Sequence, residues 1–479
     1  MFFGREQELS ELGELWKKTS SSFVVCSGRR RIGKSTLIEE FAARSKCRFI
    51  EIVGMAPDEG VTNGLQLRNF CERLSVQTGQ PNVQADCWAK AFDALYAALK
   101  GRGRTVVFLD EISWMGAYDR AFAALLKTAW DTQFSRRDNL VFVVCGSVSS
   151  WINRNILRSR AFVGRVSLAL SVPEMPLRDC RKFWGAAAGR VSTHEMLDFL
   201  CVVGAVPKYL SEMKPSLSAE ENIRRMCFSK EGYLYRDFDV IFTDVFKKSA
   251  SERLKIVECI AERPQSVRTL AAALGVASNG HLSEALSELV EAGFVSADEG
   301  LNPSSSKEVR EVRYRIRDNY MRFYLKFIRP RAQAIRAGSY RFSSIDRLPG
   351  FDGVMGLQFE NLVRGNLRTL LRLIGMDNTV LVSAAPYVRR GKAKGEGFQV
   401  DLLLQTKKSV CVVEAKRCEK IGIEVEDAVR EKIRRLKLPR DISVRTALVY
   451  DGYLDSTIEE NNYFDYLIPA ERLFEWSGE

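Results

Sequence analysis

The stretch Ser22-Phe-Val-Val-Cys-Ser-Gly28-Arg-Arg-Arg-Ile-Gly33-Lys34-Ser35-Thr36 decides the fold of the N-terminal part of this chain. An apolar run typical of a buried strand ends at Gly28, and a helical segment opens at Gly33, so the pattern G-x-x-x-x-G-K-S lies between a strand and a helix. Glycines let the backbone N–H groups of such a loop turn inward, and the helix N-terminus adds its dipole, which together favour a bound phosphate. The stretch therefore predicts an ATP-binding loop with five nucleotide-binding residues, Gly28, Gly33, Lys34, Ser35 and Thr36.

A second apolar run, Gly103-Arg-Thr-Val-Val-Phe-Leu-Asp110-Glu111, ends in two carboxylates. Such a run is common by itself, but downstream of a phosphate loop it predicts the acidic half of an ATPase site. We expect Lys34 to reach the β- and γ-phosphates, and Ser35 and Asp110 to hold Mg²⁺. Glu111 is the candidate catalytic residue that orients or deprotonates the attacking water. ATP and Mg²⁺ are accordingly the predicted cofactors.

A further strand-like run, residues 139–147, ends in Gly146-Ser147. Strands that alternate with helices form parallel sheets, whose ligands lie outside the carboxyl ends of the strands. This places Ser147 on the γ-phosphate side as a candidate sensor, unless it is an ordinary turn serine. Arg165 is a candidate for stabilising transferred phosphate, in cis or from a neighbouring subunit, against the alternative of an ordinary surface arginine.

The bulk composition narrows the class of protein. The chain has 479 residues, of which 46% are hydrophobic, a length typical of roughly three domains. Lys and Arg total 72 against 60 for Asp and Glu, a net charge of +12, which favours a polyanionic partner. Residues 301–350 contain twelve basic and four acidic residues, so this segment alone carries +8.

Histidine and cysteine usage excludes several kinds of site. With only two histidines, His194 and His281, a zinc site or a Ser-His-Asp triad is excluded in practice. The eleven cysteines are scattered, several inside apolar runs, as expected for buried thiols in a reducing compartment. No signal segment and no run of about eighteen apolar residues occurs, so we expect a cytoplasmic protein without a membrane partner.

Several motifs together carry a family resemblance. Phe3-Gly4-Arg5-Glu6-x-Glu8-Leu9, the phosphate loop, Leu109-Asp110-Glu111, Cys145-Gly146-Ser147 and Gly204-Ala-Val-Pro207-Lys-Tyr-Leu210 resemble the archaeal-type ATPase family, which lies near the AAA+ and STAND ATPases. The resemblance covers roughly residues 1–245 and implies ATP hydrolysis. The last motif usually reads Gly-Gly-x-Pro-x-Tyr-Leu and belongs to a helical lid, so it implies a nucleotide contact by Pro207. Ala205 stands here in place of the second glycine of that motif.

The middle of the chain predicts a winged helix. Helical periodicity around residues 254–260, 267–274 and 281–293 is followed by Phe294-Val295 and by a strand pair expected to span residues 309–316. The third helix occupies the recognition position but carries Glu284, Glu288 and Glu291, so the wing is the favoured DNA contact. Its candidate phosphate-binding residues are Arg310, Arg313, Arg315 and Arg317. Equally open is a packing module in which these arginines lie on a solvated face.

The C-terminal third carries a charge constellation on an expected β-hairpin, residues 399–405 and 409–416. Asp401 and Glu414 can meet across the hairpin, and Lys416 shares a face with Glu414 because side chains alternate with period two. Two carboxylates binding Mg²⁺ beside a lysine suit phosphodiester cleavage.

The pattern D-x₁₂-E-x-K, preceded by a helical Glu360, resembles the PD-(D/E)xK nuclease fold, although Val400 replaces the proline. This resemblance implies the catalytic residues Glu360, Asp401, Glu414 and Lys416. Lys432 is a further candidate for a phosphate contact. The alternative is a chance pattern on strand surfaces. Asp451 and the pair Glu459-Glu460 are interpreted as solvated surface.

The expected fold class is an α/β multidomain protein with a parallel P-loop sheet of the ASCE type. The expected domains are a P-loop core (1–172), a helical lid (173–249), a winged helix (250–330), a linker (331–350) and a restriction-endonuclease-like domain (351–479). The favoured function is an ATP-hydrolysing switch coupled to a Mg²⁺-dependent nuclease-like domain, with DNA preferred over RNA. Two alternatives stay open: a STAND-type signalling ATPase with a silent C-terminal domain, acting through protein partners or self-association, and a DNA-binding regulator without cleavage.

Overall fold

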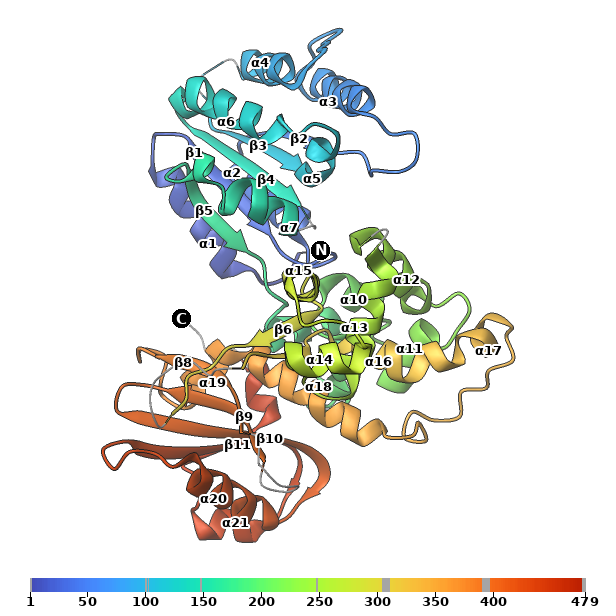
Figure 1. Cartoon of the computed structure of the whole chain (residues 1–479), viewed down its shortest axis with the longest axis vertical. Helices are drawn as coiled ribbons and strands as arrows, with labels where there is room; N and C mark the ends of the chain where they lie inside the picture. Colours follow the sequence, from blue (N-terminus) through green and yellow to red (C-terminus); the bar gives the residue numbers. More distant parts are fainter. Residues whose placement is uncertain are drawn as a thin grey trace. The chain divides into compact units, whose positions relative to one another are not determined.

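The protein is described here by a computed structural model that covers residues 2–99, 101, 103–146, 149–246, 249–303, 311–389 and 397–475. The chain forms two compact units, Met1–Pro173 and Glu174–Glu479, drawn in Figure 1. Each unit contains its own five-stranded sheet.

The sheet of the first unit is entirely parallel and has the strand order β2-β3-β4-β1-β5. Its strands are β1 (Ser22–Ser27), β2 (Arg48–Val53), β3 (Thr105–Asp110), β4 (Leu140–Gly146) and β5 (Val166–Ser171). This confirms the predicted α/β fold with a parallel sheet. Because all strands run the same way, the phosphate loop after β1 and the carboxylates after β3 lie at the same edge of the sheet.

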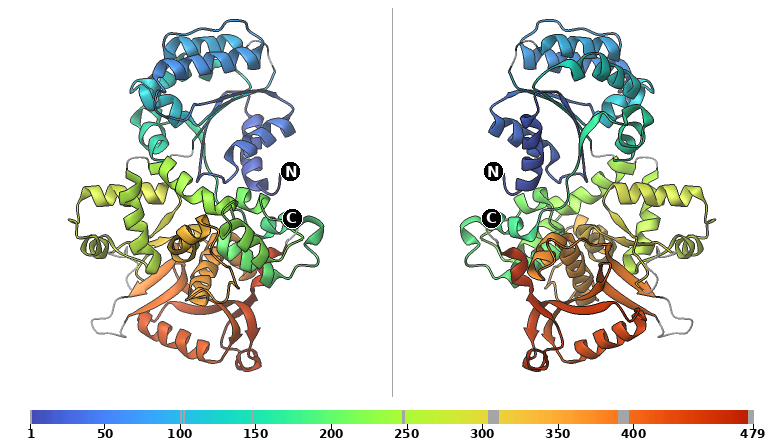
Figure 2. Two further views of the ribbon diagram at one scale, coloured as in Figure 1. Left: turned by 90° about the vertical axis from the view of Figure 1, so that its right-hand side faces the viewer. Right: turned by 90° about the vertical axis from the view of Figure 1, so that its left-hand side faces the viewer.

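Helices cover both faces of this sheet (Figure 2). On one face lie α1 (Glu6–Glu14) and α2 (Lys34–Ser45), and on the other α3 (Asn63–Thr78), α4 (Trp88–Ala98) and α6 (Phe122–Thr132). The short helices α5 (Ile112–Met115) and α7 (Ser149–Ile152) follow β3 and β4. A central strand of such a sheet is buried on both sides, which explains why β1, β3 and β4 read as continuous apolar runs.

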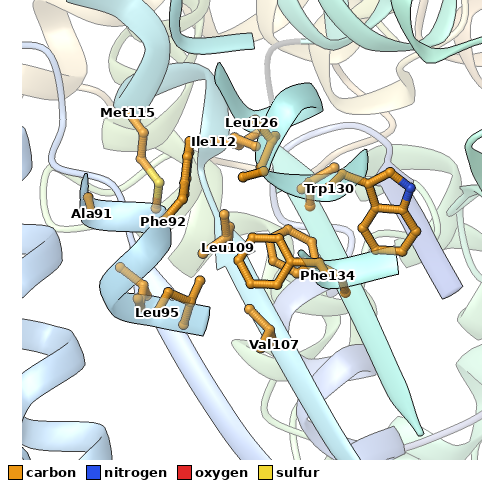
Figure 3. Packing of buried hydrophobic residues seen from close by; sticks show 14 of the residues in the cluster. Ala91, Phe92, Leu95, Val107, Leu109, Ile112, Met115, Leu126, Trp130 and Phe134 are labelled. Atoms are coloured by element: carbon orange, nitrogen blue, oxygen red, sulfur yellow. The ribbon is translucent and has the colours of Figure 1, made fainter. Parts of the chain in front are cut away.

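The core beneath α4 and α6 supports β3 (Figure 3). Phe92 and Leu95 of α4 pack with Val107 and Leu109 of β3 and with Phe134, and each of these side chains is fully buried. Removing a buried side chain of this size costs about 2–5 kcal/mol. The end of β3, where Asp110 lies, is therefore held by a rigid support.

The second unit begins with helices and continues into three helices and a β-hairpin. The first helices are α8 (Leu177–Cys180), α9 (Thr193–Val203), α10 (Pro207–Ser211), α11 (Ala219–Cys227) and α12 (Tyr233–Phe246). The next elements are α13 (Ala250–Glu262), α14 (Val267–Leu274), α15 (Gly280–Glu291), β6 (Val295–Asp298) and β7 (Arg313–Ile316). β6 and β7 pair antiparallel, with Val295 opposite Ile316. The three helices are those that the periodicity predicts, whereas the hairpin pairs residues 295–298 with residues 313–316 and does not lie within the predicted 309–316. α16 (Asn319–Phe323) and α17 (Ala332–Arg336) follow these elements.

The second sheet has the order β12-β11-β10-β9-β8 and is mixed. Its strands are β8 (Ser383–Arg389), β9 (Phe398–Gln405), β10 (Ser409–Ile421), β11 (Ser443–Leu454) and β12 (Tyr466–Pro469). β8, β9 and β10 pair antiparallel, whereas β10, β11 and β12 pair parallel. The hairpin predicted at residues 399–416 is present as β9 and β10.

Helices flank this second sheet too (Figure 1). They are α18 (Phe351–Gly365), α19 (Leu367–Leu373), α20 (Glu424–Leu436) and α21 (Ser456–Asn461). α20 packs its apolar side on the sheet through Val425 and Val429, and α18 contacts β10. Across the described residues, no helix combines the length and the apolar character needed to cross a membrane. All eleven cysteines carry free thiols.

Candidate functional site

Two glycines give the phosphate loop its shape. Gly28 has φ +149°, and a Cβ atom built there would lie 2.7 Å from the carbonyl oxygen of Val172. Gly33 has φ +87° and caps the N-terminus of α2. Both conformations favour glycine because a side chain is strained in this region of φ. The loop therefore depends on glycine at both predicted positions.

The Lys34 ammonium bridges the loop. Its Nζ donates hydrogen bonds to the carbonyl oxygens of Gly28 and Arg29, each at 3.0 Å, and the residue is only 7% exposed. The lysine is thus held at the N-terminus of α2, where the helix dipole and the backbone N–H groups favour an anion. Thr36, in the first turn of α2, has an exposed side chain.

The two predicted Mg²⁺ ligands of the first unit contact each other. The Ser35 hydroxyl donates to Asp110 Oδ2 at 2.6 Å, and the other oxygen of Asp110 accepts from the backbone N–H of Glu111 at 2.9 Å. Hydroxyl and carboxylate oxygens are the donor types that Mg²⁺ prefers. This pair fits the expected cation. Glu111 itself follows with φ +50° at the start of α5, an uncommon conformation for a residue other than glycine.

Arg165 is bound within its own unit. Its Nε and Nη2 donate to the two carboxylate oxygens of Asp131 on α6, at 2.6 and 2.8 Å. The hydrogen bonds from Arg165 lower the pKa of Asp131 to about 2. To contact a phosphate, the Arg165 guanidinium would first have to leave Asp131. No local pattern in the sequence signals this partner, which lies 34 positions away.

Three further residues were predicted to take part in binding, namely Ser147, Pro207 and Arg310. Ser147 and Arg310 fall outside the described residues. Pro207 is in the second unit, at the first position of α10, and follows the sharp turn at Gly204, whose φ is +71°.

The predicted carboxylates of the second unit do lie together. Val413 of β10 pairs with Leu402 of β9, so Asp401 and Glu414 follow at the next position of the hairpin. Asp401 Oδ2 accepts a hydrogen bond from the Ala415 backbone N–H at 3.1 Å. Asp401 is 7% exposed and Glu414 1%. Buried carboxylates require compensating charge.

Two lysines supply part of that charge. Lys432 of α20 donates to both oxygens of Glu414, at 2.7 and 2.6 Å. Lys416 lies 2.9 Å from Glu414 Oε1, and its side chain is 41% exposed against 19% for Lys432. Lys416 is thus the lysine of this site that solvent, and hence a substrate, reaches more readily.

Glu360 joins the same site from α18. Its carboxylate accepts from Arg364 Nη2 at 2.8 Å, and Arg364 Nε donates to the carbonyl oxygen of Asp401 at 2.8 Å. Burial raises the pKa of Asp401 to about 7, with the charges of Glu414 and Glu360 adding to the effect and Lys432 opposing it. Burial likewise raises the pKa of Glu360. No pattern in the sequence indicates a role for Arg364.

This arrangement suits a cation held partly by substrate. In the described part of the chain, no group of three or more His, Cys, Asp or Glu side chains is arranged to hold a metal ion. Mg²⁺ characteristically uses one or two carboxylates together with phosphate oxygens and water. Asp401 and Glu414, two buried carboxylates at neighbouring positions of the hairpin, fit that mode of binding.

The expectation that Arg315 lies on a solvated face is wrong. Its Nε donates to Asp298 Oδ1 at 3.0 Å, and its Nη1 contacts Asn361 of α18. Burial lowers the pKa of Arg315 to about 10. The solvated face expected for this strand is partly covered here, because Asn361 of α18 contacts Arg315 and the carbonyl oxygen of Ile316.

The other wing arginines differ from one another. The Arg313 side chain is 15% exposed and lies 3.8 Å from Glu311, whereas Arg317 is exposed. Of the predicted nucleic-acid contacts in or next to the described β6–β7 hairpin, Arg317 is therefore the most accessible.

The interpretation of Asp451 as solvated surface is also wrong. Its side chain is 9% exposed and accepts from Arg417 Nε at 3.0 Å, and it lies 3.1 Å from His194 Nδ1 of α9. Arg417 also contacts Asp198 of α9. The hydrogen bond with Asp451 raises the pKa of His194. Asp451 is buried because β11 pairs with β10 in a register that places it beside Arg417. Glu459 and Glu460 are exposed, as expected.

Comparisons with known proteins agree with the first site. Residues 2–213 match a family described as an ATPase domain predominantly from Archaea. An uncharacterised protein of Methanocaldococcus jannaschii is 21% identical over 444 residues, which cover 91% of this chain and 92% of that protein. An uncharacterised ATP-binding protein of the same organism is 35% identical over 52 residues, 11% of this chain and 88% of that protein.

Two solved structures were also found to be similar. The Walker-type ATPase of Pyrococcus abyssi is 16% identical with a TM-score of 0.49, over 68% of this chain and 96% of that one. The Aeropyrum pernix ORC2 protein, in its ADPNP–ADP complexes, is 17% identical with a TM-score of 0.41, over 70% and 95%.

Proposed function

From the archaeal-type ATPase domain that this chain carries over residues 2–213, we propose that the protein is an ATP-hydrolysing switch whose second unit acts on nucleic acid. In this proposal the second unit cleaves phosphodiester bonds with Mg²⁺, and DNA is the preferred substrate. One observation carries the nuclease part: Asp401, Glu414 and Lys416 of the hairpin lie together with Glu360 and Lys432, which come from other parts of the sequence.

The ATPase part follows from the loop and the carboxylates after β3. Lys34, the first residue of α2, would exchange its two carbonyl partners for phosphate oxygens. Ser35 and Asp110 would hold Mg²⁺, which neutralises charge that develops on the transferred phosphoryl group. Glu111, the residue after Asp110, would orient the attacking water.

In the second unit, Asp401 and Glu414 would hold Mg²⁺, which when bound supplies an activated water and neutralises phosphate charge. The exposed lysine Lys416 would orient the nucleophile or stabilise the oxygens of the scissile phosphate. Lys432 donates to both oxygens of Glu414 and would contact a phosphate only after leaving that carboxylate.

Two substitutions test the ATPase part. Lys34→Ala should abolish nucleotide binding, whereas Glu111→Gln should leave binding intact and stop turnover. The Lys17 side chain is 73% exposed, so Lys17→Ala serves as the matched control and should hydrolyse ATP at the native rate. Unchanged hydrolysis in both site variants would place the nucleotide site elsewhere.

Cleavage assays test the nuclease part. Plasmid and single-stranded DNA are incubated with the full chain and Mg²⁺ or Mn²⁺, with and without ATP. We expect cleavage that Lys416→Ala abolishes and that Lys420→Ala preserves, because the Lys420 side chain is 65% exposed on the same strand and pairs with Asp455. No cleavage by the native protein, or equal cleavage by Lys416→Ala, contradicts the nuclease proposal.

The bidentate contact of Lys432 favours a second candidate function. An ammonium group already lies on both oxygens of Glu414, as in a site that binds no metal. The protein would then be a STAND-type signalling ATPase acting through protein partners, or a DNA-binding regulator without cleavage. DNA binding that weakens steeply between low and moderate salt supports the regulator, since each phosphate contact releases counterions. Absence of DNA binding supports the signalling ATPase.

A further inference from the structure

One turn of α18 contacts both the carboxylate site and the hairpin of the middle module. Arg364 uses two nitrogens of its guanidinium fork, Nε on the carbonyl oxygen of Asp401 and Nη2 on the carboxylate of Glu360, both at 2.8 Å. Its side chain is 10% exposed. A rigid fork that holds two oxygens at once fixes their separation, which a lysine ammonium on a flexible stem does not.

The same turn is anchored on its other side. Asn361 Nδ2 donates to the carbonyl oxygens of Ile316 and Arg317, each at 3.1 Å, and to Asn319 Oδ1 at 2.9 Å. Gln358, one turn earlier, exchanges two hydrogen bonds with the backbone and side chain of Asn319, at 2.7 and 3.2 Å. Both Gln358 and Asn319 are buried. The turn that carries Glu360 and Arg364 therefore has a fixed place on the end of β7.

We infer that Arg364 is a positioning residue for the carboxylate site, and that Asn361 anchors the turn from which it acts. This inference rests on the proposed nuclease function of Asp401 and Glu414. Arg364 holds the backbone of Asp401 at a set distance from Glu360. This places the Asp401 carboxylate so that it can bind a divalent cation together with Glu414.

Charge alone does not explain Arg364. Two further arginines, Arg315 and Arg322, also act electrostatically on Glu360; Arg322 is buried and the Arg315 side chain is 12% exposed. Positive charge around Glu360 is thus supplied several times over. In the described structure, Arg364 is the arginine that hydrogen-bonds both Glu360 and the backbone of Asp401, which is why its geometry matters.

The test is Mn²⁺ binding to the full chain without nucleotide, measured by calorimetry. Asp401→Asn identifies the binding that belongs to this site. Groups that orient metal ligands typically contribute about 10–100-fold to metal affinity, so Arg364→Gln should weaken Mn²⁺ binding by about that factor. Arg364→Lys keeps the charge but loses the fork, and should bind Mn²⁺ as weakly as Arg364→Gln. Asn361→Ala should weaken binding in the same direction.

The matched control is Arg434→Gln. Arg434 also pairs with a glutamate on its own helix, Glu431, but its side chain is 77% exposed, so Mn²⁺ affinity should stay native. Urea unfolding of each variant separates positioning from folding, because a positioning role lowers affinity while the unfolding midpoint of Arg364→Lys stays close to native.

The outcomes distinguish a failure of the positioning role of Arg364 from a failure of the proposed metal site. Native affinity in Arg364→Gln, or full recovery in Arg364→Lys, overturns the positioning role and leaves the proposed function standing. A loss of affinity that merely follows a loss of folded protein overturns it as well. Native protein and Asp401→Asn that bind Mn²⁺ identically overturn both the inference and the metal site on which it rests.

Discussion

Replacing Lys432 by methionine should destabilise β10 strongly. Glu414 is 1% exposed and accepts two hydrogen bonds from Lys432, at 2.7 and 2.6 Å. Removing one partner of a buried ion pair leaves an uncompensated charge and typically costs about 3–5 kcal/mol. Because Lys416 also contacts Glu414, we expect the lower end, about 3 kcal/mol.

Native-state hydrogen exchange of the β10 amides measures this cost locally. A loss of about 3 kcal/mol speeds exchange from the globally opened state by roughly a hundredfold. Lys420→Met is the matched control on the same strand, since an exposed pair contributes little, and its β10 amides should exchange within a few-fold of native. The double variant Lys432→Met with Glu414→Gln should recover much of the protection, because the buried charge is then absent.

A divalent cation should substitute for the missing ammonium. A ligand at one hundred times its dissociation constant stabilises the folded state by about 2.7 kcal/mol. Saturating Mn²⁺ should therefore slow β10 exchange more in Lys432→Met than in the native protein. Exchange in Lys432→Met that equals native exchange would refute the reasoning, because Glu414 would then not depend on Lys432 for its charge balance.

Two further predictions concern the wing and the contact between α9 and β11. Arg317→Ala should lower the slope of log affinity for DNA against log salt concentration by about one phosphate contact, as measured by DNA titrations at several salt concentrations. Arg315→Met should leave that slope unchanged but lower the free energy of unfolding, as measured in urea. The His194 pKa is raised by Asp451, so the stability from this pair is fully present below the ordinary histidine pKa of about 6.5 and is lost as pH rises through the higher folded value. His194→Gln should therefore flatten the pH dependence of hydrogen exchange at the α9 amides over this pH range. An unchanged pH dependence would show that the His194–Asp451 pair adds nothing to the stability of α9.

Motifs made of neighbouring residues could be predicted from the sequence. The strand, loop and helix around Gly28 and Lys34, the run that ends at Asp110, and the hairpin that carries Asp401 and Glu414 all depend on local periodicity and on turn residues. The parallel sheet followed from strand–helix alternation. Even the meeting of Asp401 with Glu414 depended only on the register of a single tight hairpin.

Contacts between distant elements were decided by the tertiary structure alone. The alternation of β7 left open whether Arg315 faces solvent, because only the packing of α18 determines which face is covered. Asp451 is buried since β11 pairs with β10 in one particular register, and Arg165 contacts Asp131 because α6 packs beside the segment that precedes β5. Arg364 shows the same rule: a side chain that bridges two elements depends on how those elements pack, and hydrophobic burial across the whole unit sets that packing.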